Sequence, residues 1–166
     1  MKPPASARQI SIILVGPEDH ARLADLHGLC FDPAWGRDSI IGIFAVPGAL
    51  GLIARIEGSA VGFSLCRRVG VESELLALGV LPARRRGGIA RALLDATIQA
   101  LAKDGLRALF LEVAEDNAAG RALYDAAGFT AVGRHADFYR RDGAEPAAAL
   151  ILRREIIPEI RPSEGA

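Results

Sequence analysis

Short apolar and β-branched runs recur along the chain and stop at glycine, proline or charged residues, which is typical of β-strands. These runs span residues 10–15, 50–56, 60–69, 72–82, 107–115, 129–140 and 147–156. The polar turn Glu57-Gly58-Ser59 between the second and third runs indicates a hairpin, and the polar segment 141–146 joins the last two runs as an antiparallel pair. The run 107–115 is mainly apolar, which predicts a strand covered on both faces.

Apolar residues at helical spacing predict the other elements. One helix is expected over residues 18–29, and a short second helix begins at Arg37 or Asp38 and closes at Pro47-Gly48. A long helix follows residue 88 and ends near Gly105. Its apolar face is formed by Ile89, Leu93, Leu94, Ile98 and Leu101.

A last helix is expected over residues 118–128, with Asn117 as N-cap and Gly128 as the left-handed stop. The chain shows no internal repeat and no domain linker. We therefore expect one α/β (α+β) domain over residues 1–166, with a mixed central sheet flanked by about four helices. Its core is expected over about 10–155, and the tail 158–166 is expected to be flexible.

Composition narrows the possible partners. Lysine plus arginine total 20 and aspartate plus glutamate total 20, which argues against nucleic-acid binding through bulk charge. The N-terminus has no signal-like apolar segment, and no run approaches the ~18 apolar residues of a membrane span. Cys30 and Cys66 lack the spacing of a zinc site or a disulfide framework. We expect a cytoplasmic protein, monomeric or weakly dimeric, without metal or membrane partners.

The segment 81–94, LPARRRGGIARALL, places a cluster of arginines before the long helix. The N-terminus of a helix favours anions, and Gly87 and Gly88 would let backbone amides approach a phosphate. Arg85, Arg86 and Arg91 would add charge-assisted hydrogen bonds. The segment is neither a Walker loop nor a G-x-G-x-x-G fingerprint, and taken alone it fits a solvated basic turn better than a phosphate site.

The stretch Arg85-Arg86-Gly87-Gly88-Ile89-Ala90 resembles the acetyl-CoA loop of the GNAT N-acetyltransferases, whose pattern is Arg/Gln-x-x-Gly-x-Gly/Ala. Residues 109–129, LFLEVAEDNAAGRALYDAAGF, are similar to a signature of the ribosomal-protein-alanine N-acetyltransferase branch, and residues 26–35 resemble its segment between the first two helices. Ala90, where glycine is commoner, and Gly-Arg at 120–121, where apolar residues are commoner, depart from the pattern.

The resemblance implies a coenzyme slot between splayed parallel strands that end near residues 82 and 114. Acetyl-CoA would be the cosubstrate. Backbone amides near Leu78, Gly79 and Val80 would hold its thioester and pantetheine arm, and Asn117 would hydrogen-bond the same arm. No metal and no covalent enzyme intermediate would be required.

The resemblance also implies direct attack by the N-terminal amine of a ribosomal protein, with alanine first. Glu112 would be the general base, its pKa raised by an apolar surrounding, and Tyr124 the general acid. Taken alone, Glu112 could face solvent, Tyr124 could be a core residue and Asn117 only a cap.

Other residues are candidates for contact with the acceptor. Glu72 and Glu74 share one face of their strand, which makes Glu74 a reserve base or a group that attracts a cationic N-terminus. Trp35, Phe138 and Tyr139 are candidate walls of the acceptor site, with ordinary packing as the alternative. No shared spacing links His20, His27 and His135, which are expected to be structural.

Two other functions fit the same residues. A GNAT enzyme can act on a small-molecule amine, because acceptor choice would depend on the 30–47 and 138–146 loops. A non-catalytic acetyl-CoA-binding regulatory module is the third hypothesis, against which the Glu112 and Tyr124 pair counts.

Overall fold

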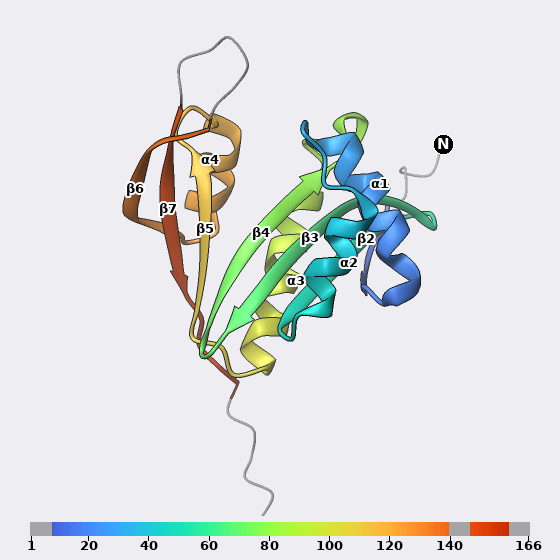
Figure 1. Cartoon of the computed structure of the whole chain (residues 1–166), viewed down its shortest axis with the longest axis horizontal. Coiled ribbons are helices and arrows are strands. Elements are labelled where there is room, and N and C mark those ends of the chain that lie inside the picture. The colour runs from blue at the N-terminus through green and yellow to red at the C-terminus, as the bar shows by residue number, and fades with distance from the viewer. Residues whose placement is uncertain (1–7, 140–146, 160–166) are drawn as a thin grey trace, which may run out of the picture. The chain divides into compact units, whose positions relative to one another are not determined.

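The fold was determined as a computed structural model that describes residues 8–139 and 147–159 (Figure 1). Its strands are β1 (Ile10–Leu14), β2 (Ala49–Ile56), β3 (Ser59–Val69), β4 (Glu72–Val80), β5 (Ala108–Ala114), β6 (Thr130–Tyr139) and β7 (Ala147–Glu155). Its helices are α1 (His20–Cys30), α2 (Arg37–Ala45), α3 (Ile89–Lys103) and α4 (Ala118–Ala126), with 3-10 turns η1 (Pro17–Asp19) and η2 (Pro82–Arg84). The predicted order of strands and helices is confirmed.

The strands form one mixed sheet in the order β1-β2-β3-β4-β5-β7-β6. Glu72, Ser73 and Glu74 of β4 lie in parallel register with residues 108–110 of β5, whereas β7 is antiparallel to both β5 and β6. The described chain divides into two compact units. The first unit comprises the chain up to Arg67 with Leu76–Thr97, and the second comprises Arg68–Leu75 with the chain from Ile98 onward.

In the first unit, the strands carry apolar side chains on both faces. Leu23, Leu26 and Ile40 of α1 and α2 pack with Ile53 and Phe63 on one face. The other face is covered by the start of α3, whose residues pack against β2, β3 and β4. This second group comprises Leu52, Ala54, Ile56, Val61, Val80, Ile89 and Leu93. The α3 residues Ile89 and Leu93 are among those predicted for its apolar face.

Two hydroxyl groups are buried within this unit. Ser64 of β3 and Thr97 of α3 are 1% exposed, and their oxygen atoms lie 2.8 Å apart. The Thr97 hydroxyl donates to the carbonyl of Leu93 at 2.8 Å. Because a hydroxyl has a single proton, Ser64 must be the donor to Thr97.

In the second unit, β5 departs from the prediction for residues 107–115. Leu109, Leu111 and Val113 are buried, whereas Phe110 and Glu112 are only half-buried. The alternation shows that one face of β5 is covered and the other is partly open, so the prediction of a strand covered on both faces is wrong. The charged carboxylate of Glu112 is compatible only with the partly open face of β5.

Other boundaries agree closely with the sequence. The first helix begins two residues late, at His20, because Pro17–Asp19 form a 3-10 turn. The pairing of β6 with β7 is confirmed, and the predicted turn 141–146 lies outside the described residues. Among the described residues, no helix combines the length and apolar character that a bilayer crossing requires.

Candidate functional site

In the first unit, the arginine segment connects β4 to α3. Arg85 and Arg86 are exposed, and the Arg85 Nε donates to the carbonyl oxygen of Val80 at 3.1 Å. Arg86 has a φ of +64° and Gly88 a φ of +78°, which turn the backbone sharply before the helix. The left-handed region costs a residue other than glycine about 1–2 kcal/mol. Strain of this kind is common where a loop binds a ligand.

The start of α3 leaves room for an anion. The N–H of Ala92 donates to the carbonyl of Gly88 at 3.0 Å, which makes Gly88 the first residue to accept a helical hydrogen bond. Apart from Gly88 itself and its two neighbours in the chain, no described atom lies within 4 Å of the position that a Cβ of Gly88 would take. The first-turn N–H groups of a helix have no partner within the helix, so they are suited to a phosphate. Arg91 is exposed on α3 and bonds to Asp95 at 3.0 Å.

Gly79 of β4 is needed for close packing. A Cβ there would lie 2.8 Å from Cε1 of Phe63 and 3.1 Å from both Cβ of Cys30 and Cε2 of Phe31. Burial raises the pKa of the Cys30 thiol, and the charge of Arg85 opposes that rise. The side chains around Gly79 thus account for the glycine without a coenzyme.

Trp35 lies in an aromatic cluster between α1 and α2. Its ring stacks on the buried His27 ring at a centroid distance of 4.6 Å, and Phe31 stacks on His27 at 4.7 Å. The Trp35 backbone N–H donates to Nδ1 of His27 at 3.0 Å. Burial lowers the pKa of His27, which favours the neutral ring that can accept this bond. The expectation that His27 is structural agrees with these contacts.

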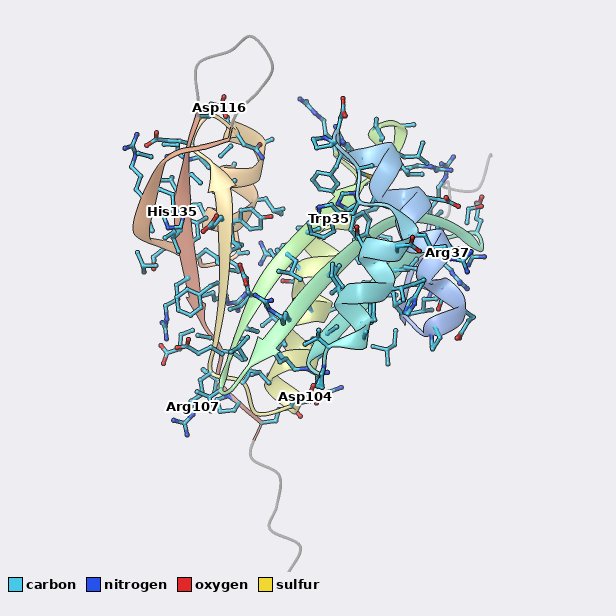
Figure 2. All side chains as sticks on the ribbon, viewed as in Figure 1. Trp35, Arg37, Asp104, Arg107, Asp116 and His135 are labelled. Carbon is cyan, nitrogen blue, oxygen red and sulfur yellow. The ribbon has the colours of Figure 1, made fainter. Side chains whose placement is uncertain are left out.

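In the second unit, Glu112 projects from the partly open face of β5. Its side chain is 25% exposed, and its Oε1 lies 3.0 Å from Nδ1 of His135 on β6. The His135 side chain is 47% exposed. It is labelled in Figure 2. The sequence predicts a structural role for His135 and contains no sign of this pairing.

A cavity of about 230 Å³ brings both predicted candidates for the base together. Glu74 and Glu112 line it with Glu72, and Phe110 provides an aromatic wall. The remaining lining residues are Val69, Ser73, Leu111 and Ile151. Several carboxylates beside an aromatic ring form a suitable environment for an amine or ammonium group.

Asn117 and Tyr124 lie on α4. Asn117 is the predicted N-cap, since its Oδ1 accepts from the N–H of Gly120 at 2.9 Å, and Gly128 has the predicted left-handed φ of +85°. Tyr124 is half-buried and meets Phe129 edge to face at 5.6 Å. Tyr139 belongs to β6, but its side chain lies outside what the structure describes.

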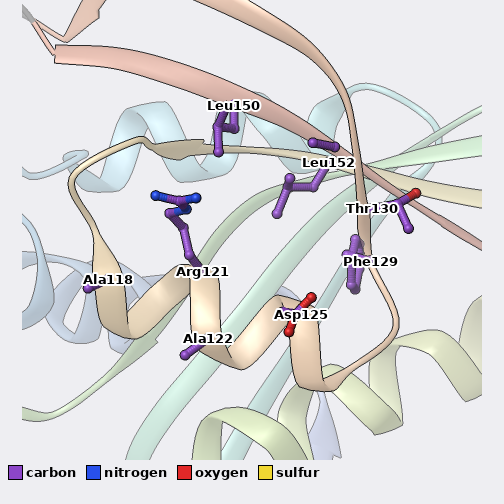
Figure 3. A pocket seen from close by; sticks show the side chains of 9 residues that line it. Ala118, Arg121, Ala122, Asp125, Phe129, Thr130, Leu150 and Leu152 are labelled. Atoms are coloured by element: carbon purple, nitrogen blue, oxygen red, sulfur yellow. The ribbon is translucent and has the colours of Figure 1, made fainter.

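A larger cavity of about 600 Å³ lies between α4 and the β6–β7 pair (Figure 3). The side of α4 that lines it carries Ala118, Arg121, Ala122 and Asp125, which are too small or too polar to fill the space over the leucines of β7. Its other lining residues are Phe129, Thr130, Ala131, Leu150 and Leu152. None of the predicted catalytic or binding residues lines this cavity.

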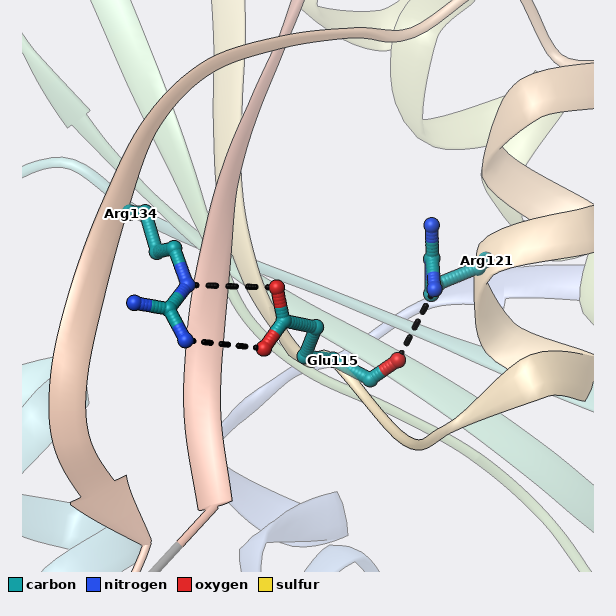
Figure 4. A network of polar contacts seen from close by, with 3 residues as sticks. All are labelled: Glu115, Arg121 and Arg134. Carbon is teal, nitrogen blue, oxygen red and sulfur yellow. Dashed lines mark hydrogen bonds and ion pairs between the residues drawn. The ribbon is translucent and has the colours of Figure 1, made fainter.

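An ion pair lies next to the Glu112 region but involves other residues. Glu115 accepts two hydrogen bonds from Arg134, both 3.1 Å, and its backbone carbonyl accepts one from Arg121 at 2.9 Å (Figure 4). The bonds from Arg134 hold the pKa of the Glu115 carboxyl below its ordinary value. Arg121, which departs from the family pattern, therefore joins α4 to the end of β5 through a hydrogen bond.

No cluster of three or more His, Cys, Asp or Glu side chains within residues 8–139 and 147–159 has an arrangement suited to a metal ion.

Comparison with known proteins identifies the family. Residues 20–129 match the model of the acetyltransferase (GNAT) family. The ribosomal protein bS18-alanine N-acetyltransferase of Escherichia coli K12 is 36% identical over 97 residues, which cover 58% of this chain and 66% of that protein. The match therefore spans just under two thirds of that relative. The N-alpha-acetyltransferase RimI of Mycobacterium tuberculosis H37Rv is 32% identical over 157 residues, covering 91% of this chain and 96% of that protein.

Solved structures agree on the fold. The crystal structure of the E. coli ribosomal-protein-S18-alanine N-acetyltransferase superposes with a TM-score of 0.82 at 24% identity, covering 95% of this chain and 99% of that one. Arabidopsis thaliana NAA60 in complex with acetyl-CoA gives a TM-score of 0.74 at 20% identity, with 89% and 99% covered. The predicted fold and family are confirmed: the chain belongs to the acetyltransferase (GNAT) family.

Proposed function

We propose that the chain transfers an acetyl group from acetyl-CoA to the N-terminal amine of a protein, with a ribosomal protein that begins with alanine as the acceptor. The observation that carries the proposal is the half-buried Glu112 carboxylate at the wall of a cavity that Glu74 and Phe110 also line. The names of the E. coli and M. tuberculosis relatives support this acceptor class.

Acetyl-CoA binding is assigned to the first unit. The open space over Gly88, the first turn of α3 and the exposed Arg85 and Arg86 suit the phosphates of a coenzyme. The further contacts follow the family pattern: Gly87, Ile89, Ala90 and Arg91 around the phosphates, and the backbone of Leu78, Gly79 and Val80 along the pantetheine arm. When bound, the thioester supplies the activated acetyl group.

Proton transfer is assigned to the second unit. An ammonium has no lone pair, so Glu112 would first take a proton from the acceptor. The Tyr124 phenol would donate a proton to the departing thiolate. Asn117 would hydrogen-bond the pantetheine arm through its amide N–H while its Oδ1 caps α4. No covalent bond to the enzyme forms in this scheme.

Acceptor binding is assigned to Glu74, Trp35 and Tyr139. Glu74 lies in the cavity with Glu112, where its charge would attract a cationic N-terminus. A cavity of about 230 Å³ has room for a small amine as well, which favours a small-molecule acceptor as the second candidate function.

The test is acetyl transfer to peptides with free Ala, Ser or Met N-termini, beside an N-blocked peptide with an internal lysine and a panel of small amines. We expect transfer only to free N-termini, fastest for alanine. Transfer confined to small amines would establish the second candidate. Coenzyme binding without transfer to any amine would indicate the regulatory module.

Coenzyme binding has its own control. Arg85→Gln and Arg86→Gln should each raise the KM for acetyl-CoA by about tenfold, the size expected when a charge-assisted hydrogen bond is lost. Arg37→Gln removes an exposed charge from α2 and should leave this KM unchanged. Equal KM values in all three variants would remove the arginines from the coenzyme site.

A further inference from the structure

His135 reaches Glu112 across an intervening strand. Glu112 is paired with Ile151 of β7, whereas His135 is paired with Ala149, so the two side chains meet diagonally over β7. Their Nδ1–Oε1 distance is 3.0 Å. Ala149, which is paired with His135, has a short side chain, and the Ile151 side chain lies against Gly133, where a Cβ would be 3.0 Å from its Cδ1.

A bulge in β6 decides which side chain takes this position. Ala131 is paired with Leu152, but the next paired residue is Gly133, opposite Ile151, so Val132 is left out of the register. A shift of one residue moves every following side chain of a strand to the other face.

If Val132 were paired with Ile151 in regular register, Arg134 would stand opposite Ala149, on the face of Glu112. His135 would then face the other way. The chain therefore places an imidazole against Glu112 and directs the guanidinium of Arg134 to Glu115. The choice matters chemically, because an arginine stays protonated whereas an imidazole can gain and lose a proton near neutral pH.

We propose that His135 is a positioning residue for acetyl transfer, which orients the Glu112 carboxylate and then carries its proton to solvent. The proposal rests on the proposed function, in which Glu112 is the general base. The His135 ring suits this role, because it contacts Glu112 through Nδ1 and is about half exposed to solvent.

The proton moves in three steps. An N–H bond of the acceptor ammonium breaks as an O–H bond forms on Glu112. That O–H bond breaks as an N–H bond forms at Nδ1 of His135, and the resulting imidazolium releases the proton of Nε2 to water. The neutral ring, now protonated at Nδ1, donates to the restored Glu112 carboxylate; before the next turnover Nε2 takes a proton from water and Nδ1 gives one up to water, which returns the ring to the tautomer that can accept from Glu112. No oxidant or further reactant is needed.

Two variants separate orientation from proton transfer. His135→Ala should lower kcat by about tenfold or more, which is less than the roughly 10²- to 10⁴-fold effect of a general acid–base group because His135 acts through Glu112, with little change in either KM. Added imidazole should restore part of that kcat. His135→Gln keeps an N–H donor for Glu112 but cannot carry a proton, so it should stay slow and should not respond to imidazole. Arg134→Gln, the neighbouring control, should keep the wild-type kcat.

A readout without turnover tests the pairing itself. In ¹⁵N spectra of the imidazole rings, Glu112→Gln should shift the Nδ1 resonance of His135 and leave those of His20 and His27 in place. An unshifted His135 resonance, or a wild-type kcat in His135→Ala, would overturn the proposal. If Glu112→Gln transfers acetyl at the wild-type rate, the assignment of the base fails. A shifted resonance would then identify a purely structural pair, which also overturns the relay.

Discussion

Two carboxylates near the end of β5 differ sharply in their partners. Glu112 contacts the imidazole of His135, whereas Glu115 accepts two hydrogen bonds from the guanidinium of Arg134. The partners are neighbours on β6, and the carboxylates are only three residues apart. One glutamate nevertheless lines a cavity with Glu74, while the other joins α4 to the sheet through Arg121.

The difference separates a carboxylate beside a residue type that can gain and lose a proton from one beside a permanent positive charge. Arg134 stays protonated and lowers the pKa of Glu115, so this carboxylate is a poor base at neutral pH. A histidine places no such permanent charge beside Glu112. Identical residue types thus receive different chemistry from the residue that faces them.

The largest effect on kcat is expected when each of the two glutamates is replaced separately by glutamine. Glu112→Gln should lower kcat by about 10²- to 10⁴-fold, because the acceptor loses its general base. Glu115→Gln should change kcat by less than about twofold, because surface ion pairs contribute little. Steady-state transfer to the preferred peptide measures both, and equal losses in the two variants would contradict the comparison.

Exchanging the two β6 residues in the double variant Arg134→His with His135→Arg should interchange the partners. The register of β6 is kept, so a permanently charged guanidinium would lie on the face of Glu112 and the imidazole on the face of Glu115, and kcat should fall by about tenfold or more. The two side chains are 55% and 47% exposed, so little buried area is lost. Circular dichroism would verify folding, and a folded double variant with the wild-type kcat would show that the choice of partner has no part in the reaction.

A smaller effect is expected at the N-cap of α4, the helix whose Arg121 donates to the carbonyl of Glu115. Asn117→Ala should lower the free energy of unfolding by about 1 kcal/mol, because the bond to the N–H of Gly120 is lost.

Asn117→Asp keeps the cap oxygen but removes the amide N–H, so the free energy of unfolding should stay near that of the wild type. The KM for acetyl-CoA should then rise only if that N–H binds the pantetheine arm. An unchanged KM in Asn117→Asp would leave Asn117 as a helix cap alone.

The smallest effect concerns the Arg134–Glu115 pair and depends on pH. The pKa of Glu115 is lowered in the folded protein, so the pair stabilises the fold above the ordinary glutamate pKa of about 4.3, and this contribution is lost as the pH falls. Arg134→Gln should be slightly destabilised at pH 7 and equal to the wild type in strong acid. Urea unfolding at both pH values checks this, and a difference that grows in acid would contradict it.

Local patterns were enough to predict the element order, the Asn117 cap and the Gly128 stop. Each depends on a few adjacent residues and on rules of hydrogen bonding and backbone conformation. The apolar run of β5 was misleading, because Ala108 and Phe110 hide the alternation that distinguishes an open face from a covered one. Only Glu112 marks that face in the sequence.

The pairing of Glu112 with His135 could not be predicted from the sequence. It depends on the position of β7 between β5 and β6 and on one unpaired residue, Val132. Both are properties of distant segments once they are hydrogen-bonded together. An extended stretch such as 129–140 gives no local sign of where its register shifts, and a histidine on either face looks the same.

The hydroxyl pair of Ser64 and Thr97 has a consequence for how this core can evolve. Ser64 gives its proton to Thr97, and Thr97 gives its own to Leu93. If Ser64 is replaced by alanine first, the Thr97 hydroxyl still donates to Leu93. If Thr97 is replaced by valine first, the buried Ser64 hydroxyl loses its acceptor, which costs free energy of folding. The order of the two substitutions therefore matters when this pair is replaced by apolar residues. Lineages should lose the serine hydroxyl first far more readily than the threonine hydroxyl first.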